Sequence, residues 1–177
     1  AEYRERIRWL RDAVPDMAIS TDLIVGFPGE TEAEFEDTLK LVEEVQYSFI
    51  FAFKYSPRKG TAAARMPGQI SEAVMDERLA RLNALQDSIT MRQAEADCGT
   101  IQNVLFLYRS KKNPGVFYGR TEHFRLVKVE SAGYLVGDCR PVLITGGNKT
   151  ALIGIVVGDP EHQGSAHEHE SGNSVQY

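Results

Sequence analysis

The chain has 177 residues, of which 42% are hydrophobic and 25% are charged, and its formal net charge is −5. It contains no apolar run of the roughly 20 residues that a membrane-spanning helix needs, so we expect no membrane partner. The charge is uneven along the sequence, because residues 100–158 hold 8 Lys and Arg against 3 Asp and Glu, whereas residues 1–99 hold 12 against 18. An acidic protein would disfavour nucleic acid, but a compact basic segment favours it. Ordinary solubilising surface charge is the open alternative.

The N-terminal part predicts alternating helices and strands. Helical spacing of apolar residues predicts helices over residues 4–14 and 32–45, and apolar runs predict strands over residues 18–25 and 48–55. Thr31 and Glu34 have the spacing of a capping box at the start of the second helix. Alternation of this size implies a parallel sheet with right-handed crossovers.

A glycine-rich turn follows the first strand, with the sequence Gly26-Phe27-Pro28-Gly29-Glu30. Small residues between a strand and a helix N-terminus let a ligand approach the backbone, where free N–H groups are available. The sequence therefore predicts a ligand-sized gap at the C-terminal end of this strand.

Residues 72–96 predict one long helix. An apolar stripe runs along it, and Arg78 and Arg81 lie mostly outside that stripe. Gly99 is suited to a left-handed cap beyond its end. Two interpretations are open: a rigid arm between two domains, or a helix that covers a sheet.

Five short β-rich segments follow, and turn residues separate them: 104–108, 116–120, 125–129, 140–144 and 151–157. Such a series predicts a small OB-like barrel. Barrels of this kind hold oligonucleotides in a cationic groove with aromatic stacking. The candidate cations are Lys111, Lys112, Arg120, Arg125 and Lys128, and the candidate stacking residues are Tyr118, His123 and Phe124.

The cysteines and the last segment give weaker signals. Cys98 and Cys139 are far apart in sequence, and we expect both to be packed as small hydrophobic residues. Unpaired cysteines favour a reducing, cytoplasmic location. Residues 159–177 have little to bury and predict a disordered tail, whose histidines give little support to a metal site.

Several sequence blocks together resemble a known family. Asp22-Leu23-Ile24-Val25-Gly26-Phe27-Pro28-Gly29-Glu30-Thr31 and Tyr55-Ser56-Pro57-Arg58-Lys59-Gly60-Thr61 resemble consecutive blocks of the radical S-adenosylmethionine methylthiotransferases. Residues 110–115 and 119–127 resemble the TRAM domain of members that act on tRNA. Lys59 and Ala62 depart from the prolines that are common in the family.

The resemblance implies a domain organisation and a cofactor site. Residues 1–70 would be the C-terminal part of a partial (β/α) radical SAM barrel, 71–99 a connecting helix, 100–158 a five-stranded TRAM barrel that binds RNA, and 159–177 a tail. Ile24, Gly26 and Glu30 would contact S-adenosylmethionine. The family motif has one residue fewer before its glutamate, so Glu30 has an alternative role at the helix N-terminus, through the helix dipole.

The resemblance also implies an activity, namely methylthiolation at C2 of N6-isopentenyladenosine next to the tRNA anticodon. This chemistry uses S-adenosylmethionine and [4Fe–4S] clusters, whose Cys-x-x-x-Cys-x-x-Cys ligands are absent from this sequence. We therefore expect part of a longer enzyme, inactive alone and monomeric, with the tRNA anticodon arm and a reductant protein as partners. The alternatives are a stand-alone RNA-binding module, or a methylthiotransferase acting on threonylcarbamoyl adenosine or a ribosomal protein. Arg58 and Lys59 could meet either a carboxylate or a phosphate.

Overall fold

The computed structural model describes residues 2–158, which form two compact units. The first unit ends at Ala96 and the second begins at Asp97. Among the described residues, no helix combines the length and the apolar character needed to cross a membrane. The predictions made for residues 159–177 lie outside the described residues.

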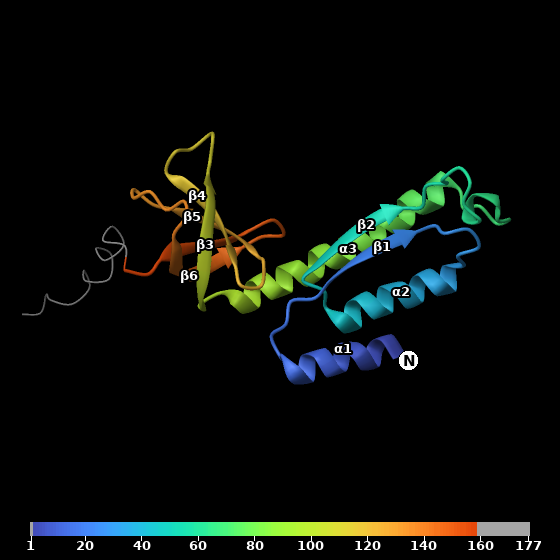
Figure 1. The fold of residues 1–177 in the computed structure, drawn as a ribbon, viewed down its shortest axis with the longest axis horizontal. Helices are drawn as coiled ribbons and strands as arrows, with labels where there is room; N and C mark the ends of the chain where they lie inside the picture. The colour runs from blue at the N-terminus through green and yellow to red at the C-terminus, as the bar shows by residue number, and fades with distance from the viewer. Residues whose placement is uncertain (1, 159–177) are drawn as a thin grey trace, which may run out of the picture. The chain divides into compact units, whose positions relative to one another are not determined.

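The first unit has the predicted order of helix, strand, helix and strand, followed by a long helix (Figure 1). Strands β1 and β2 are parallel and in register from the Ser20–Phe49 pair to the Val25–Lys54 pair, which confirms the predicted parallel sheet. The elements are α1 (Glu2–Ala13), β1 (Ser20–Val25), α2 (Glu32–Val45), β2 (Phe49–Lys54), the short 3₁₀ helix η1 (Ala63–Arg65) and α3 (Glu72–Asp97).

Helix α2 begins where its capping box predicts. The Thr31 hydroxyl accepts a hydrogen bond from Glu34 N–H at 3.3 Å, and the Glu34 carboxylate accepts one from Thr31 N–H at 2.8 Å. The backbone N–H of Thr31 is the main reason that the pKa of Glu34 lies below its usual value. Two N–H groups that a helix start leaves free are thereby satisfied.

One face of the two-stranded sheet carries the core of this unit. Val25 of β1 and Ile50 of β2 pack with residues of α2 and α3, among them Phe35 and Leu82, which are fully buried. Successive residues of a strand point to opposite faces. The opposite face therefore presents the alternate residues of both strands, and Ile24, Phe49, Phe51 and Phe53 on it are each at least half exposed.

Helix α3 corrects one sequence-based expectation. Leu82 and Ile89 of its apolar stripe join the core, as a helix that covers a sheet would. Arg78, however, lies inside the unit and is 4% exposed, whereas the helical pattern predicts a position outside the stripe. Its guanidinium can be buried because carboxylates of the neighbouring segment pair with it.

The second unit is a closed barrel of five strands, which confirms the predicted OB-like fold. Around the barrel the order is β3-β4-β5-β7-β6, and every pair is antiparallel except β5 with β7. Strands β3 and β6 are longer than predicted: the added start of β3 pairs with β6 and closes the barrel, whereas the added end of β6 pairs with β7. The strands are β3 (Ile101–Arg109), β4 (Val116–Thr121), β5 (Leu126–Glu130), β6 (Cys139–Gly147) and β7 (Leu152–Val156).

The barrel interior is filled by alternate residues of its strands. Val104 and Phe106 of β3, with Val127 of β5, are at most 1% exposed. At Gly119 of β4 a Cβ atom would lie 2.6 Å from the carbonyl oxygen of Leu105 on the neighbouring strand. Close approach of the two backbones therefore requires glycine at this position.

The predicted burial of the two cysteines is wrong. Cys98 and Cys139 are both free and exposed. Cys98 follows the end of α3, and Cys139 occupies an outward position of β6, two residues before Pro141 and three before the inward-facing Val142. Strand alternation decides which face Cys139 occupies, and it overrides the general tendency of cysteine to be buried.

Candidate functional site

The turn after β1 is built by two glycines with positive φ. Gly26 has φ +76° and Gly29 has φ +87°, a region that side-chain-bearing residues rarely adopt. Gly29 N–H donates to the carbonyl oxygen of Gly68 at 2.9 Å, and Glu30 N–H donates to that of Phe27 at 2.9 Å. A Cβ atom on Gly26 would also clash with the side chain of Met75. The turn therefore packs closely on the start of α3.

The carboxylate of Glu30 is an internal partner of this turn. Its Oε2 atom accepts hydrogen bonds from Gly26 N–H and from Nη1 of Arg78, both at 2.7 Å. The same Arg78 nitrogen donates to the Glu30 carbonyl oxygen at 3.1 Å. The side chains of Arg78 and Glu30 are 5% and 14% exposed, so little water screens their attraction. Arg78 thereby fixes the end of β1 to α3 through Glu30.

This arrangement bears on the three residues expected at a cofactor. Ile24 and Gly26 lie at the C-terminal end of β1, with the Ile24 side chain on the open sheet face opposite Phe53. Gly26 N–H and Glu30 Oε2 bond to each other instead of facing outward. Cofactor binding by Ile24, Gly26 and Glu30 stays a prediction. The geometry favours Ile24 as a residue that contacts the cofactor, and Glu30 as a residue that holds the turn in place.

The open sheet face carries exposed apolar side chains that are suited to contact with a nucleoside. Ile24 and Phe53 are 57% and 53% exposed, and Phe51 continues the apolar surface. A purine ring stacks or packs on such surfaces. The residues thus fit the adenosyl group of S-adenosylmethionine. They do not fit an iron–sulfur cluster, because the described residues contain no group of three or more His, Cys, Asp or Glu side chains able to hold a metal.

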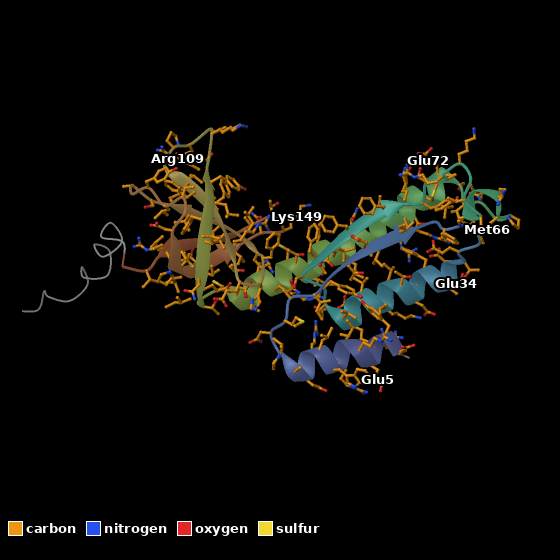
Figure 2. The ribbon with its side chains drawn as sticks, in the orientation of Figure 1. Glu5, Glu34, Met66, Glu72, Arg109 and Lys149 are labelled. Atoms are coloured by element: carbon orange, nitrogen blue, oxygen red, sulfur yellow. The ribbon has the colours of Figure 1, made fainter. Side chains whose placement is uncertain are left out.

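Of the basic residues near this end of the sheet, Lys54 is paired with carboxylates, whereas Arg58 and Lys59 lie in an exposed loop. Lys54, at the end of β2, donates to Asp76 at 2.8 Å and to Glu72 at 3.1 Å, and these bonds raise its pKa. Figure 2 shows Glu72 in the first turn of α3, close to this strand end. Arg58 and Lys59 are exposed in the loop after β2, and their partner stays a prediction.

On the barrel, the loop between β3 and β4 presents the two lysines expected to meet RNA. Lys111 and Lys112 are exposed, and among the described residues neither ammonium group has an ion-pair partner. The Ser110 hydroxyl accepts hydrogen bonds from the N–H groups of Lys112 and Asn113 at 3.3 and 3.2 Å, which orders the loop backbone. Figure 2 shows Arg109 at the β3 end of this loop. The ordered loop backbone thus presents two ammonium groups that have no ion-pair partner among the described residues.

The turn between β4 and β5 presents an aromatic ring and a cation. Phe124 has φ +62° and is 73% exposed, unusual for a large apolar side chain. The Arg120 guanidinium lies over its ring at 4.5 Å and donates to its carbonyl oxygen at 2.8 Å. His123 beside it is exposed. Arg120, His123 and Phe124 thus lie together at one turn.

Two of the expected RNA-binding cations are engaged within the protein. Burial lowers the pKa of Arg125, and Asp97, 3.9 Å away, opposes this effect. Lys128 donates to Glu130 at 3.2 Å and keeps about a third of its side chain exposed. The structure therefore brings Lys111, Lys112, His123 and Phe124 to exposed positions and Arg120 to a partly exposed one. It leaves Arg125 mostly covered.

Sequence reasoning misses two residues that matter to these sites. Helical spacing assigns Arg78 to a solvated helix face, and only its distance in space to Glu30 reveals its role. Tyr108 reads as part of an apolar strand, although it stacks on Tyr118 at the barrel surface. The sequence holds a hint for Tyr108, because strict alternation from Val104 and Phe106 makes it an inward residue, and a tyrosine hydroxyl in a small barrel is costly.

Comparison with known proteins finds several curated relatives of the chain. No family model matches it. It is 45% identical over 155 residues to the tRNA-2-methylthio-N(6)-dimethylallyladenosine synthase of Moorella thermoacetica, and 43% and 41% identical over 153 residues to those of Aeromonas salmonicida and Protochlamydia amoebophila. These alignments cover 86 to 88% of the chain. The chain spans about a third of the length of these curated relatives. The chain is thus similar to a part of each of these synthases.

Proposed function

We propose that the protein to which this chain belongs is a radical S-adenosylmethionine methylthiotransferase that modifies C2 of N6-isopentenyladenosine next to the anticodon of tRNA. The observation that carries the proposal is the identity of 37 to 45%, over 86 to 93% of the chain, to proteins named for this product. The basic surface on an OB-like barrel supports it independently.

The two units would have separate tasks. In the second unit, Lys111, Lys112 and Arg120 would meet tRNA phosphates, and Phe124 would meet a base. In the first unit, Ile24 and Phe53 would form an apolar wall for the adenosyl group, and the Arg78–Glu30 pair would hold the adjoining turn in place. A substrate base must leave its loop to reach such a wall.

The radical chemistry would depend on groups held elsewhere. When bound, S-adenosylmethionine and [4Fe–4S] clusters supply the carbon-centred radical and the sulfur chemistry. The described residues of this chain contribute binding and positioning, and no set of thiolates among them fits a cluster. We place the protein in the cytoplasm, as a monomer that receives electrons from a reductant protein.

Nucleoside analysis tests the reaction. In the organism that encodes the chain, disruption of the gene should leave N6-isopentenyladenosine in digested tRNA and abolish its 2-methylthio derivative, as measured by mass spectrometry. Loss of a methylthio group from threonylcarbamoyl adenosine instead would assign the other tRNA substrate. Unchanged tRNA nucleosides would overturn the proposal.

Salt dependence tests the RNA surface. For each phosphate that the protein no longer neutralises, the slope of log K against log salt should fall by about 1. The change of Lys111 and Lys112 to Ala should therefore weaken binding of the chain to tRNA and reduce this slope. Lys40→Ala is the matched control, because this exposed lysine lies on α2 of the first unit. An equal effect of the control and the loop variant would show that RNA binds elsewhere.

A further inference from the structure

Two tyrosines lie face to face on the outer surface of the barrel, beside the lysine-bearing loop. Tyr108 of β3 and Tyr118 of β4 are directly opposite in the strand register. Their rings are stacked, with centroids 5.2 Å apart and an interplanar angle of 21°. Tyr108 is 48% exposed and Tyr118 is partly exposed. The described residues thus leave part of a stacked aromatic pair open to solvent.

A β-bulge sets the outward direction of Tyr108. The register of β3 with β4 shifts by one residue between Phe106 and Tyr108, so Leu107 and Tyr108 together oppose Tyr118. In a regular strand Leu107 would point outward and Tyr108, the next residue, would point to the inner face, as Phe106 does. Bulges re-aim side chains and often occur beside functional sites. Here the bulge places on the surface an aromatic ring that the regular pleat would have buried.

The surroundings of the pair are basic. Lys128 of β5 is directly opposite Tyr118, so Tyr108, Tyr118 and Lys128 form a row across three strands. Arg120 points to the same side two residues further along β4. Lys111 lies three residues beyond Tyr108, in the adjoining loop. Because Lys128 pairs with Glu130, the charges of Arg120 and Lys111 are the ones on this face that complement a phosphate backbone running past the rings.

We propose that Tyr108 and Tyr118 form a stacking platform for an unpaired nucleobase of RNA. This inference rests on the proposed function and adds the part of tRNA that the barrel contacts, namely exposed bases of a single-stranded loop. Stacking on an aromatic ring tolerates any base, because every base has a π face. The platform would therefore add affinity for unpaired RNA without reading its sequence, while the neighbouring cations meet phosphates.

The test compares binding of the whole chain to a single-stranded RNA oligonucleotide and to its duplex, by fluorescence anisotropy. Tyr108→Ala should weaken binding of the single strand at least about fivefold, the lower end of base stacking energies. Tyr108→Phe should restore binding to within about twofold, since the ring alone stacks. Neither variant should change the salt slope, because stacking releases no counterions. Tyr134→Ala, at an exposed tyrosine outside the row, is the matched control.

The outcomes separate this inference from the proposed function. If Tyr108→Ala and Tyr118→Ala bind the single strand as the parent does, while the Lys111 and Lys112 variant still lowers the salt slope, the platform is refuted and the RNA surface stands. An equal loss for the duplex and the single strand would also refute it. If the parent chain binds neither RNA, both the proposed RNA-binding role and the stacking platform are refuted.

Discussion

Removal of the Arg78 side chain tests the account of the turn after β1. Breaking a buried ion pair costs about 3 to 5 kcal/mol because the remaining charge stays buried without its partner. Glu30 would keep its bond from Gly26 N–H, and its side chain is 14% exposed. We therefore expect Arg78→Met to lower the free energy of unfolding of the first unit by about 3 kcal/mol, the lower end of that range.

The assay is urea denaturation followed by far-ultraviolet circular dichroism. The described helices α1 to α3 belong to the first unit or end at its boundary, so the helical signal reports on that unit. Arg81→Met is the matched control, because Arg81 lies on the same helix with a side chain 34% exposed and with more exposed partners. This control substitution should cost no more than about 1 kcal/mol.

A double-mutant cycle measures the Arg78–Glu30 pair itself. The combined variant Arg78→Met with Glu30→Gln should be more stable than the sum of the two single effects implies, by at least about 1 kcal/mol, because the residues are in direct contact. Additive effects would contradict the buried pair. So would an Arg78→Met variant no less stable than the Arg81→Met control.

Two further predictions concern the same unit. Gly26→Ala should destabilise it by at least about 1 kcal/mol through the unfavourable left-handed backbone, and Met75→Ala in the same background should relieve part of the clash with that side chain; no recovery of the urea midpoint would refute the contact. Burial, and then a hydrogen bond with Tyr3, raise the pKa of Tyr47. Since an unfolded tyrosine titrates near pH 10, stability from Tyr47 should be complete below that pH and fall above it. Tyr47→Phe should show a smaller alkaline decrease of the urea midpoint, and an equal decrease would contradict the shift.

The sequence predicts most of the fold because local signals agree with one another. The bounds of α2 follow from its capping box and its apolar spacing, and the structure begins the helix after Thr31 as predicted. The five strands of the barrel follow from β-rich segments between turns. The extra residues at the start of β3 were not predictable in this way, because barrel closure pairs them with residues of β6 that are far away in sequence.

The candidate sites could be predicted only in part. The glycine-rich turn is one continuous stretch of sequence, and Lys111 and Lys112 are neighbours in another. The sequence therefore shows each of them directly. Burial of Arg78 depends on Glu30, 48 positions earlier, and no periodicity along α3 reports that distance. The bulge that turns Tyr108 outward depends on the partner strand β4, so alternation within β3 alone gives the wrong face.

Cross-linking tests most directly the central claim that the second unit holds tRNA. An anticodon stem–loop RNA with a photoreactive base would be cross-linked to the chain, and the modified peptides would be identified by mass spectrometry. Cross-links are expected within residues 104–128, which contain the tyrosine pair, the lysine loop and Phe124. Absence of cross-links from residues 104–128, with cross-links confined to residues 2–96, would contradict this claim.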